Sequence, residues 1–291
     1  MIKAARIWAV LVMGFVMTAT TASAQWADEE NPVPGKFAMG AEFSYFHYEE
    51  PDFMEQSGPL FGIYAEYAMR TPENDKVGSW KEFLSSYQNN YVFGIEGQFL
   101  GGQVDYESNG TGSLDNINEY LFEIRGLAGY DFPVAEATVL TPYVGIGYRY
   151  LDDNMGGKTS TTGDRGYDRE SHYLYMPFGL KATTPLEGPW SLGFNVEYDI
   201  FLDGTQKSHF EDFDPGASTV ENDQNSGYGV RGSIQLARNV ETWNLLLEPF
   251  IRYWNVDESS LGVSCGATTC VFGHEPNNES IEYGVKVGTR F

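Results

Sequence analysis

The sequence predicts an all-β fold: a closed antiparallel up-and-down transmembrane β-barrel of about ten strands, with eight or twelve as alternatives. Three observations predict it. Ten segments alternate apolar with polar residues, as strands do when successive side chains point to opposite faces of a sheet. The connections between these segments alternate between short and long. The final segment, 279–291, carries an apolar stripe that runs to Phe291.

The ten segments recur along the chain from residue 37 onward. They lie at 37–48, 58–70, 90–104, 119–132, 139–152, 171–183, 189–202, 227–238, 242–256 and 279–291. Each is long enough for a membrane-crossing strand, which needs about 9–11 residues.

Short connections at 133–138, 184–188 and 239–241 alternate with long polar ones. The long ones lie at 105–118, 153–170, 203–226 and 257–278. Membrane barrels keep short turns on the periplasmic side and long loops outside. With an even number of strands, both termini are then expected in the periplasm.

The connection at 71–89 is an exception, because it should be a short turn but has nineteen residues. Trp80, Phe83, Leu84 and Tyr87 follow the spacing of one helix face. We expect a short amphipathic helix here. A plug, a partner contact or a misplaced strand are the alternatives.

The first residues have the pattern of a secretory signal peptide. Lys3 and Arg6 precede an apolar run at 7–17, and small residues at 22–24 form a cleavage site. The run is about eleven residues, shorter than the ~20 that a membrane helix needs. We therefore expect three parts: a signal peptide at 1–24, a periplasmic lead at 25–36 and the barrel at 37–291.

The charge balance excludes one class of partner. The chain has 41 acidic and 18 basic residues, a net charge of -23, so it repels the phosphates of nucleic acid. Its mean hydropathy of -0.35 resembles that of a soluble protein. That value does not exclude a membrane barrel, because lumen-facing polar residues dilute the lipid-facing apolar ones.

The two cysteines, Cys265 and Cys270, are separated by four residues. In an exported protein this spacing predicts a local disulfide. A metal site would need further ligands, and only His274 is near in the sequence.

The inward-facing parity of the strands predicts a charged lumen. It carries eight acids and eight bases: Glu42, Glu66, Glu96, Glu123, Glu197, Asp199, Glu248, Glu282, Arg70, Arg125, Arg149, Lys181, Arg231, Arg252, Lys286 and Arg290. About ten strands enclose little more than their own side chains. Unpaired charges in so narrow a space would be costly, so we expect them to pair and fill it. A narrow gated pore and a ligand or catalytic site are the alternatives.

No catalytic motif emerges from the four histidines. The omptin proteases, which are ten-stranded outer-membrane barrels, use Asp and His groups at the outer rim, and neither His172 nor His209 reproduces their pattern. We therefore expect no enzyme, catalytic residue or cofactor. Acidic clusters such as 152–154 and 211–214 offer oxygen ligands for Ca²⁺, but none has the spacing of an EF-hand loop.

Two features resemble bacterial outer-membrane β-barrel proteins. Tyr283, Val285, Val287 and Phe291 are similar to the terminal strand that the insertion machinery reads in such barrels. Five stretches resemble a family of outer-membrane barrels loosely grouped with porins: 48–54, 142–151, 167–171, 249–255 and 275–280. The resemblance implies fold, outer-membrane location and contact with membrane lipids, but no substrate.

The function that we expect is that of a monomeric barrel with a filled lumen and acidic external loops, in a structural or surface-binding role. A narrow porin for small solutes or ions is the first alternative. An omptin-like or lipid-modifying enzyme is the second.

Overall fold

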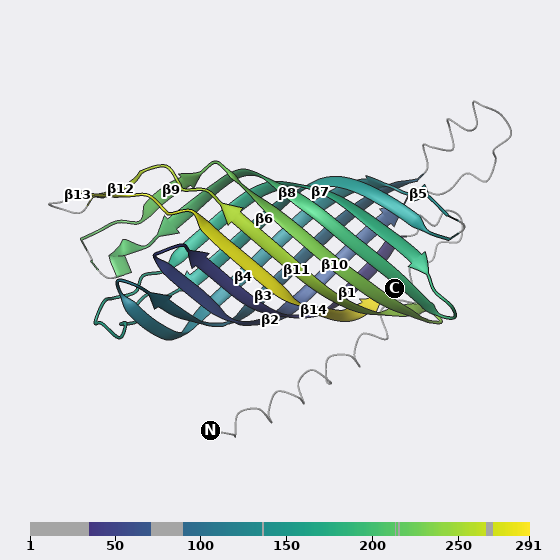
Figure 1. Cartoon of the computed structure of the whole chain (residues 1–291), viewed down its shortest axis with the longest axis horizontal. Helices are drawn as coiled ribbons and strands as arrows, with labels where there is room; N and C mark the ends of the chain where they lie inside the picture. Colours follow the sequence, from purple (N-terminus) through teal and green to yellow (C-terminus); the bar gives the residue numbers. More distant parts are fainter. Residues whose placement is uncertain (1–34, 71–89, 136, 213, 215, 266–269) are drawn as a thin grey trace, which may run out of the picture. The chain divides into compact units, whose positions relative to one another are not determined.

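The computed structural model describes residues 35–70, 90–135, 137–212, 214, 216–265 and 270–291. Ten strands form a closed antiparallel barrel (Figure 1), which confirms the predicted fold class. They are β1 (Gly35–Glu50), β2 (Met54–Arg70), β3 (Tyr91–Ser108), β4 (Gly112–Tyr130), β6 (Val139–Asn154), β7 (Arg169–Pro185), β8 (Trp190–Ser208), β10 (Gly227–Val240), β11 (Trp243–Val256) and β14 (Asn278–Arg290).

Four short strands accompany the barrel. β5 (Phe132–Pro133) pairs with β6, and β9 (Val220–Gln224) extends the sheet beside β8. β12 (Gly262–Cys265) and β13 (Cys270–Gly273) form a separate hairpin, which the Cys265–Cys270 disulfide closes, as predicted. A 3₁₀ turn, η2, spans Phe210–Asp212. No helix in the described part of the chain is long and apolar enough to cross a membrane.

The barrel closes where the first strand meets the last. β1 pairs with β14 over a continuous register from Ala38–Arg290 to Glu49–Glu279. β10 pairs with β8 and β11, so the intervening β9 does not interrupt the ring. Every barrel strand therefore has a neighbour on both sides, and the backbone donors and acceptors are satisfied inside the sheet.

The two ends of the barrel differ. At the end that we call the turn end lie the connections 134–138, 186–189 and 241–242 and the last residue of β14. At the opposite end, the loop end, lie the connections 51–53, 109–111, 155–168, 209–226 and 257–277. The expected helix at 71–89, the signal peptide and most of the lead lie outside the described residues.

The strands reach further at the loop end than the alternation indicated. β3 continues to Ser108 and β4 begins at Gly112, so the expected long loop at 105–118 is a tight hairpin. The reason is chemical. Beyond the apolar band the outward residues are polar, as Asp105 and Glu107 are, and the inward ones are apolar, as Val104 and Tyr106 are, so the alternation continues with its two faces exchanged.

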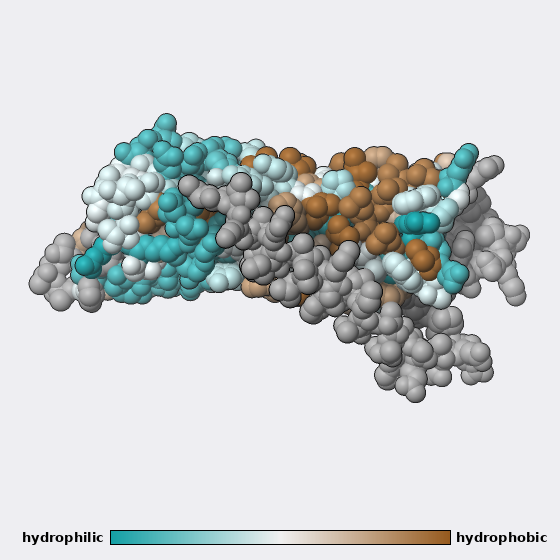
Figure 2. All heavy atoms as spheres, turned by 90° about the horizontal axis from the view of Figure 1, so that it is seen from below, coloured by the Kyte–Doolittle hydropathy of each residue, from teal (hydrophilic) through white to brown (hydrophobic). Residues whose placement is uncertain are grey.

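An apolar band covers the outer wall on the turn-end side of the loops. Figure 2 shows apolar residues gathered over one part of the wall and polar ones over the loop end. Ile63 and Val196 are 66% and 59% exposed, and such a large exposed apolar surface is the mark of a lipid-facing wall. Tyr283, Val285 and Val287 lie on the outer face of β14, and Phe291 follows it with its amide bonded to the Phe37 carbonyl at 2.8 Å.

Candidate functional site

The lumen is the candidate site, because the charged and buried polar side chains of the strands converge there. Arg231 of β10 donates both terminal nitrogens to the Glu123 carboxylate of β4, at 2.6 and 2.8 Å. Arg252 of β11 donates to Gln98 of β3 at 2.9 Å. Neither pair joins neighbouring strands, so these bonds brace the barrel across its interior.

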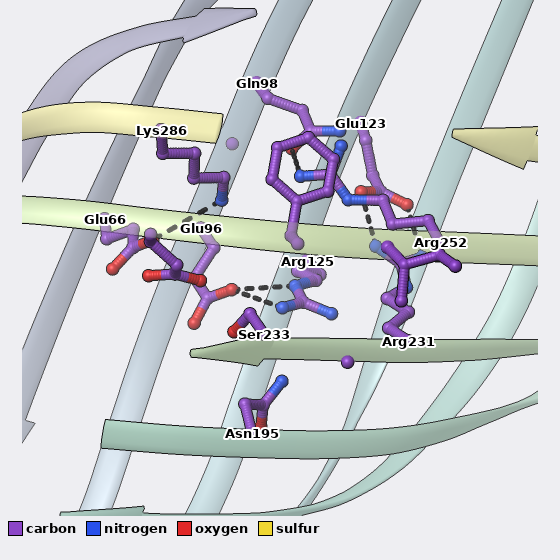
Figure 3. Close-up of a pocket in the computed structure, with 15 residues that line it drawn as sticks. Glu66, Glu96, Gln98, Glu123, Arg125, Asn195, Arg231, Ser233, Arg252 and Lys286 are labelled. Atoms are coloured by element: carbon purple, nitrogen blue, oxygen red, sulfur yellow. Dashed lines mark hydrogen bonds and ion pairs between the residues drawn. The ribbon is translucent and has the colours of Figure 1, made fainter. Parts of the chain in front are cut away.

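Arg125 links two further acids on the turn-end side of Arg231. Its Nη2 lies 2.6 Å from Glu96 Oε2, and its Nη1 lies 2.5 Å from Glu197 Oε1 (Figure 3 shows the Glu96 pair). Lys181 donates to the same Glu96 at 2.9 Å, and Tyr143 donates to Glu197 at 2.5 Å. Both carboxylates therefore receive more than one donor.

A third set lies where β1 and β14 close the barrel. Arg252 donates to Glu42 at 2.6 Å and to Glu282 at 2.9 Å. Lys286 lies 3.7 Å from Glu66 and 4.0 Å from Glu42. The contacts around Arg231, Arg125 and Arg252 together form one network that is largely buried. In it each of these arginines lies at hydrogen-bonding distance from carboxylates.

A glycine makes room for the tyrosine that bonds both members of the Arg231–Glu123 pair. Tyr175 of β7 is directly opposite Gly147 of β6, and a Cβ on Gly147 would lie 2.2 Å from the tyrosine Cζ. The ring can lie across β6 only because that side chain is missing. Its hydroxyl then donates to Glu123 at 2.8 Å and accepts from Arg231 at 2.9 Å.

On the loop-end side of this network apolar side chains fill much of the lumen. The side chains that fill it are buried and form two packed clusters. They are Phe46, Tyr48, Leu60, Leu100, Val104, Leu114, Ile117, Leu121, Leu151 and Met155 in one, and Tyr173, Tyr175, Phe201, Trp254 and Val256 in the other. We call these residues the apolar plug. The expectation of a purely charged filling missed it.

One acid is buried beside the plug. Glu119 of β4 is 0% exposed, and neither of its carboxylate oxygens has a hydrogen-bond partner among the described residues. Its cross-strand neighbour is another acid, Asp153 of β6, which accepts from Gln56 at 2.6 Å. Burying an unsatisfied carboxyl group costs stability.

Cavities enter the barrel from both ends. A cavity of about 400 Å³ lies at the turn end, lined by Lys36, Arg70, Lys181 and Arg290 among others. Another of about 350 Å³ lies under the loops, with Asp52, Asn109 and Asp164 in its wall. At the level of the Arg231 network the space is only about 40 Å³.

Arg169 ties a long loop to the rim of the plug. It donates to Glu50 of β1 at 2.6 Å and to Glu275, which precedes β14. Burial raises the pKa of Glu275 to about 7, and the Glu50 charge adds to that rise while Arg169 opposes it. Near neutral pH the Glu275 carboxyl group therefore changes between its protonated and ionised forms beside Arg169.

The sixteen charged residues predicted for the lumen make three kinds of contact. Twelve form ion pairs with one another: Glu42, Glu66, Glu96, Glu123, Arg125, Lys181, Glu197, Asp199, Arg231, Arg252, Glu282 and Lys286. Three pair outside the set: Arg70 with Asp131, and Glu248 and Arg290 with Gln235. Arg149 instead stacks on the rings of Tyr173 and Trp254, at 6.0 and 5.8 Å.

A comparison with protein families identifies the chain. The model of the outer membrane protein beta-barrel domain matches residues 9–173, more than half of the sequence. The chain belongs to this family. No curated protein matches it.

Solved structures resemble this outer-membrane barrel in fold. The outer membrane protease OmpT from Escherichia coli is 10% identical with a TM-score of 0.55, over 88% of this chain and 95% of that one. The transport unit of the autotransporter AIDA-I from Escherichia coli is 10% identical, with a TM-score of 0.40 over 92% and 94% of the chains. The toluene transporter TodX from Pseudomonas putida is 11% identical, with a TM-score of 0.34 over 89% of each. At such identities the likeness to OmpT is one of fold alone.

The histidines of this outer-membrane barrel lie outside its lumen. His172 faces outward from β7, where it hydrogen-bonds Tyr148 at 2.7 Å, and His209 follows β8. Partial burial lowers the pKa of His209, but hydrogen bonds and charge from Glu211 and Glu170 outweigh it and raise that pKa overall. None of the four histidines lines a lumen cavity.

Arg231→Met should destabilise the barrel by about 3–5 kcal/mol, because it leaves the Glu123 and Asp199 charges buried without their main partner. The measurement is the temperature at which the folded band disappears in unheated gels. Arg238→Met is the matched control, since Arg238 lies outside the lumen over the Trp190 ring. Equal loss in both variants would contradict the bracing role.

Glu119→Leu should stabilise the barrel by about 1–3 kcal/mol, because it removes a buried carboxyl group that has no hydrogen-bond partner among the described residues and faces the acid Asp153. Denaturant unfolding in lipid vesicles measures the change. Asp115→Leu, at an exposed site on the same strand, should have little effect. A destabilised Glu119→Leu barrel would mean that the carboxyl group has a partner.

The attachment of the 257–277 loop should weaken as the pH rises from about 4.5 to 7. The folded-state pKa of Glu275 lies above its unfolded value, so its contribution to stability is present below the unfolded pKa and is lost through about pH 7. Hydrogen exchange of the loop amides measures this. Glu275→Gln should remove this pH dependence. If the free energy of loop opening, as obtained from hydrogen exchange, did not change with pH in the native protein, Glu275 would not be the group responsible.

Proposed function

We propose that this outer-membrane barrel is closed to solutes and acts through its loop end, in a structural or surface-binding role. The observation that carries the proposal is the filled segment between the two cavities. There the apolar plug and the Arg231 network bury their side chains against one another. Opening a path would expose apolar side chains and separate buried ion pairs, and both changes are unfavourable.

In this proposal the loop end faces the outside of the cell and both termini face the periplasm. Three long connections at the loop end, 155–168, 209–226 and 257–277, support that orientation. The chain is exported through the signal peptide at 1–24, and the insertion machinery reads the final strand. The barrel functions as a monomer surrounded by outer-membrane lipids.

The loop-end cavity is the place where a surface ligand would bind. Its wall combines an aromatic ring, Phe53, with polar groups such as Asn109 and Asp164 and the guanidinium groups of Arg165 and Arg169. A few polar groups in a partly apolar hollow are typical of ligand sites. The net charge of -23 favours cationic partners over anionic ones and argues against nucleic acid.

A narrow pore is the second candidate, and one observation favours it. Because cavities enter from both ends, only the plug and the network separate them. An enzyme ranks third. The similarity to a protease is limited to fold, and the lumen offers no histidine as a general base.

Planar-bilayer recording separates the first two candidates. We expect no steady conductance above the bare membrane across a range of voltages. Steady single-channel openings would overturn the closed-barrel proposal in favour of the pore.

Two controls make a silent recording meaningful. Barrel insertion is verified in the same vesicles by the gel shift of the folded band, and a co-reconstituted open porin shows that fusion occurs. The Arg231→Met barrel is compared with the native one, because removing Arg231 weakens the network. If the lumen side chains are the barrier to ions, the variant should open more often than the native barrel.

A further inference from the structure

A row of glutamates crosses the outer wall at the loop end. Glu279 of β14, Glu49 of β1, Glu55 of β2 and Glu107 of β3 are directly opposite one another, each in register with the next. Like charges placed directly opposite on one face of a sheet destabilise it. Positive charge near this row of four glutamates would therefore stabilise the sheet.

No basic side chain supplies that charge among the described residues of these strands. The outward positions one step nearer the apolar band are Ile281, His47, Ser57 and Asp105. Of these four side chains only His47 can carry positive charge, and the Asp105 carboxylate adds to the negative charge. The acidic outer face of β7 to β9 differs, because Lys207 lies 3.5 Å from Glu221.

Three donor atoms of this surface lie close together. One ring nitrogen of His47 and one carboxylate oxygen each of Glu49 and Glu55 lie within 4.8 Å of one another. The His47 Nε2 and Glu49 Oε2 atoms are 3.4 Å apart. Donor atoms around a zinc ion are separated by about 3–4 Å, since each bond is about 2 Å long.

The hairpin geometry explains the convergence. His47 and Glu49 are two residues apart on β1, so they share its outer face, and Glu55 is paired with Glu49 across β2. The short connection 51–53 fixes the register of the two strands. Glu279 is held by Tyr253 at 2.8 Å and by Asn255 at 3.1 Å, so it adds charge rather than a free donor atom.

We infer that His47, Glu49 and Glu55 bind a divalent cation of the zinc type on the outer surface of the β1–β2 hairpin. The imidazole selects the class of ion, because nitrogen ligands suit zinc, copper and nickel, whereas calcium and magnesium take oxygen ligands. The three groups leave coordination positions open to water. The bound charge offsets the repulsion along the glutamate row.

The test is calorimetric titration of the folded barrel in detergent with zinc chloride, and with calcium chloride for comparison. We expect one zinc site on the native barrel and weaker binding of calcium. His47→Gln and Glu55→Gln should each lower the zinc affinity by about tenfold or more, as the loss of a ligand does. These side chains face outward, so both variants should keep the gel shift of the folded barrel.

His274→Gln is the matched control. His274 lies 3.6 Å from Glu258 in an exposed pair to which the described part of the chain adds no third donor, and its loss should leave the affinity unchanged. His209→Gln controls for the contacts of His209 with Glu170 and Glu211 in the same way. Zinc should also protect His47 from acylation by diethyl pyrocarbonate, as mapped by mass spectrometry.

Three results would overturn the inference. They are the absence of zinc binding, calcium binding as tight as zinc binding, and a His47→Gln barrel that binds zinc as tightly as the native one. Loss of the site in His209→Gln with His47→Gln unaffected would place the zinc on β7 and the loop after β8 instead.

Discussion

Closure of the sheet is the constraint on which the rest of this structure depends. A strand in hydrocarbon has no water to satisfy its backbone groups, so every strand needs a neighbour on both sides. The β1–β14 and β8–β10 pairings provide this for the first strand, for the last strand and for the strands that flank β9. Closing ten strands then fixes two faces, an apolar one toward lipid and one turned toward a narrow lumen.

The narrow lumen determines which side chains it can hold. Charges without partners there would be costly, so Arg231, Arg125 and Arg252 each meet two or more acceptors. Nearer the loops the same wall carries Phe46, Leu60 and their neighbours, which pack without needing partners. The Arg231 network thus closes the barrel through ion pairs, and the apolar plug, nearer the loop end, closes it through apolar packing.

The sequence predicted the fold because a period of two is a local property. It could not predict that Arg231 reaches Glu123 rather than an adjacent strand, since partners across a lumen depend on register and curvature together. The plug was readable in principle, because Leu121 shares the parity of Glu123, but the parity alone does not say which apolar residues it packs against. Glu119 shares this parity too, but it is the first residue of the expected segment 119–132, and it lies inside the barrel because β4 extends back to Gly112.

The central claim is that side chains exclude water from the lumen between the two cavities, and single cysteines test it most directly. The native cysteines are joined in a disulfide, so a new thiol reacts without background. In barrels held in detergent micelles, where a charged methanethiosulfonate reagent reaches both ends, Ser233→Cys at the turn-end cavity and Asn109→Cys at the loop end should react rapidly. Leu121→Cys in the plug should stay unmodified, and its reaction at a rate similar to the other two would contradict the closed lumen.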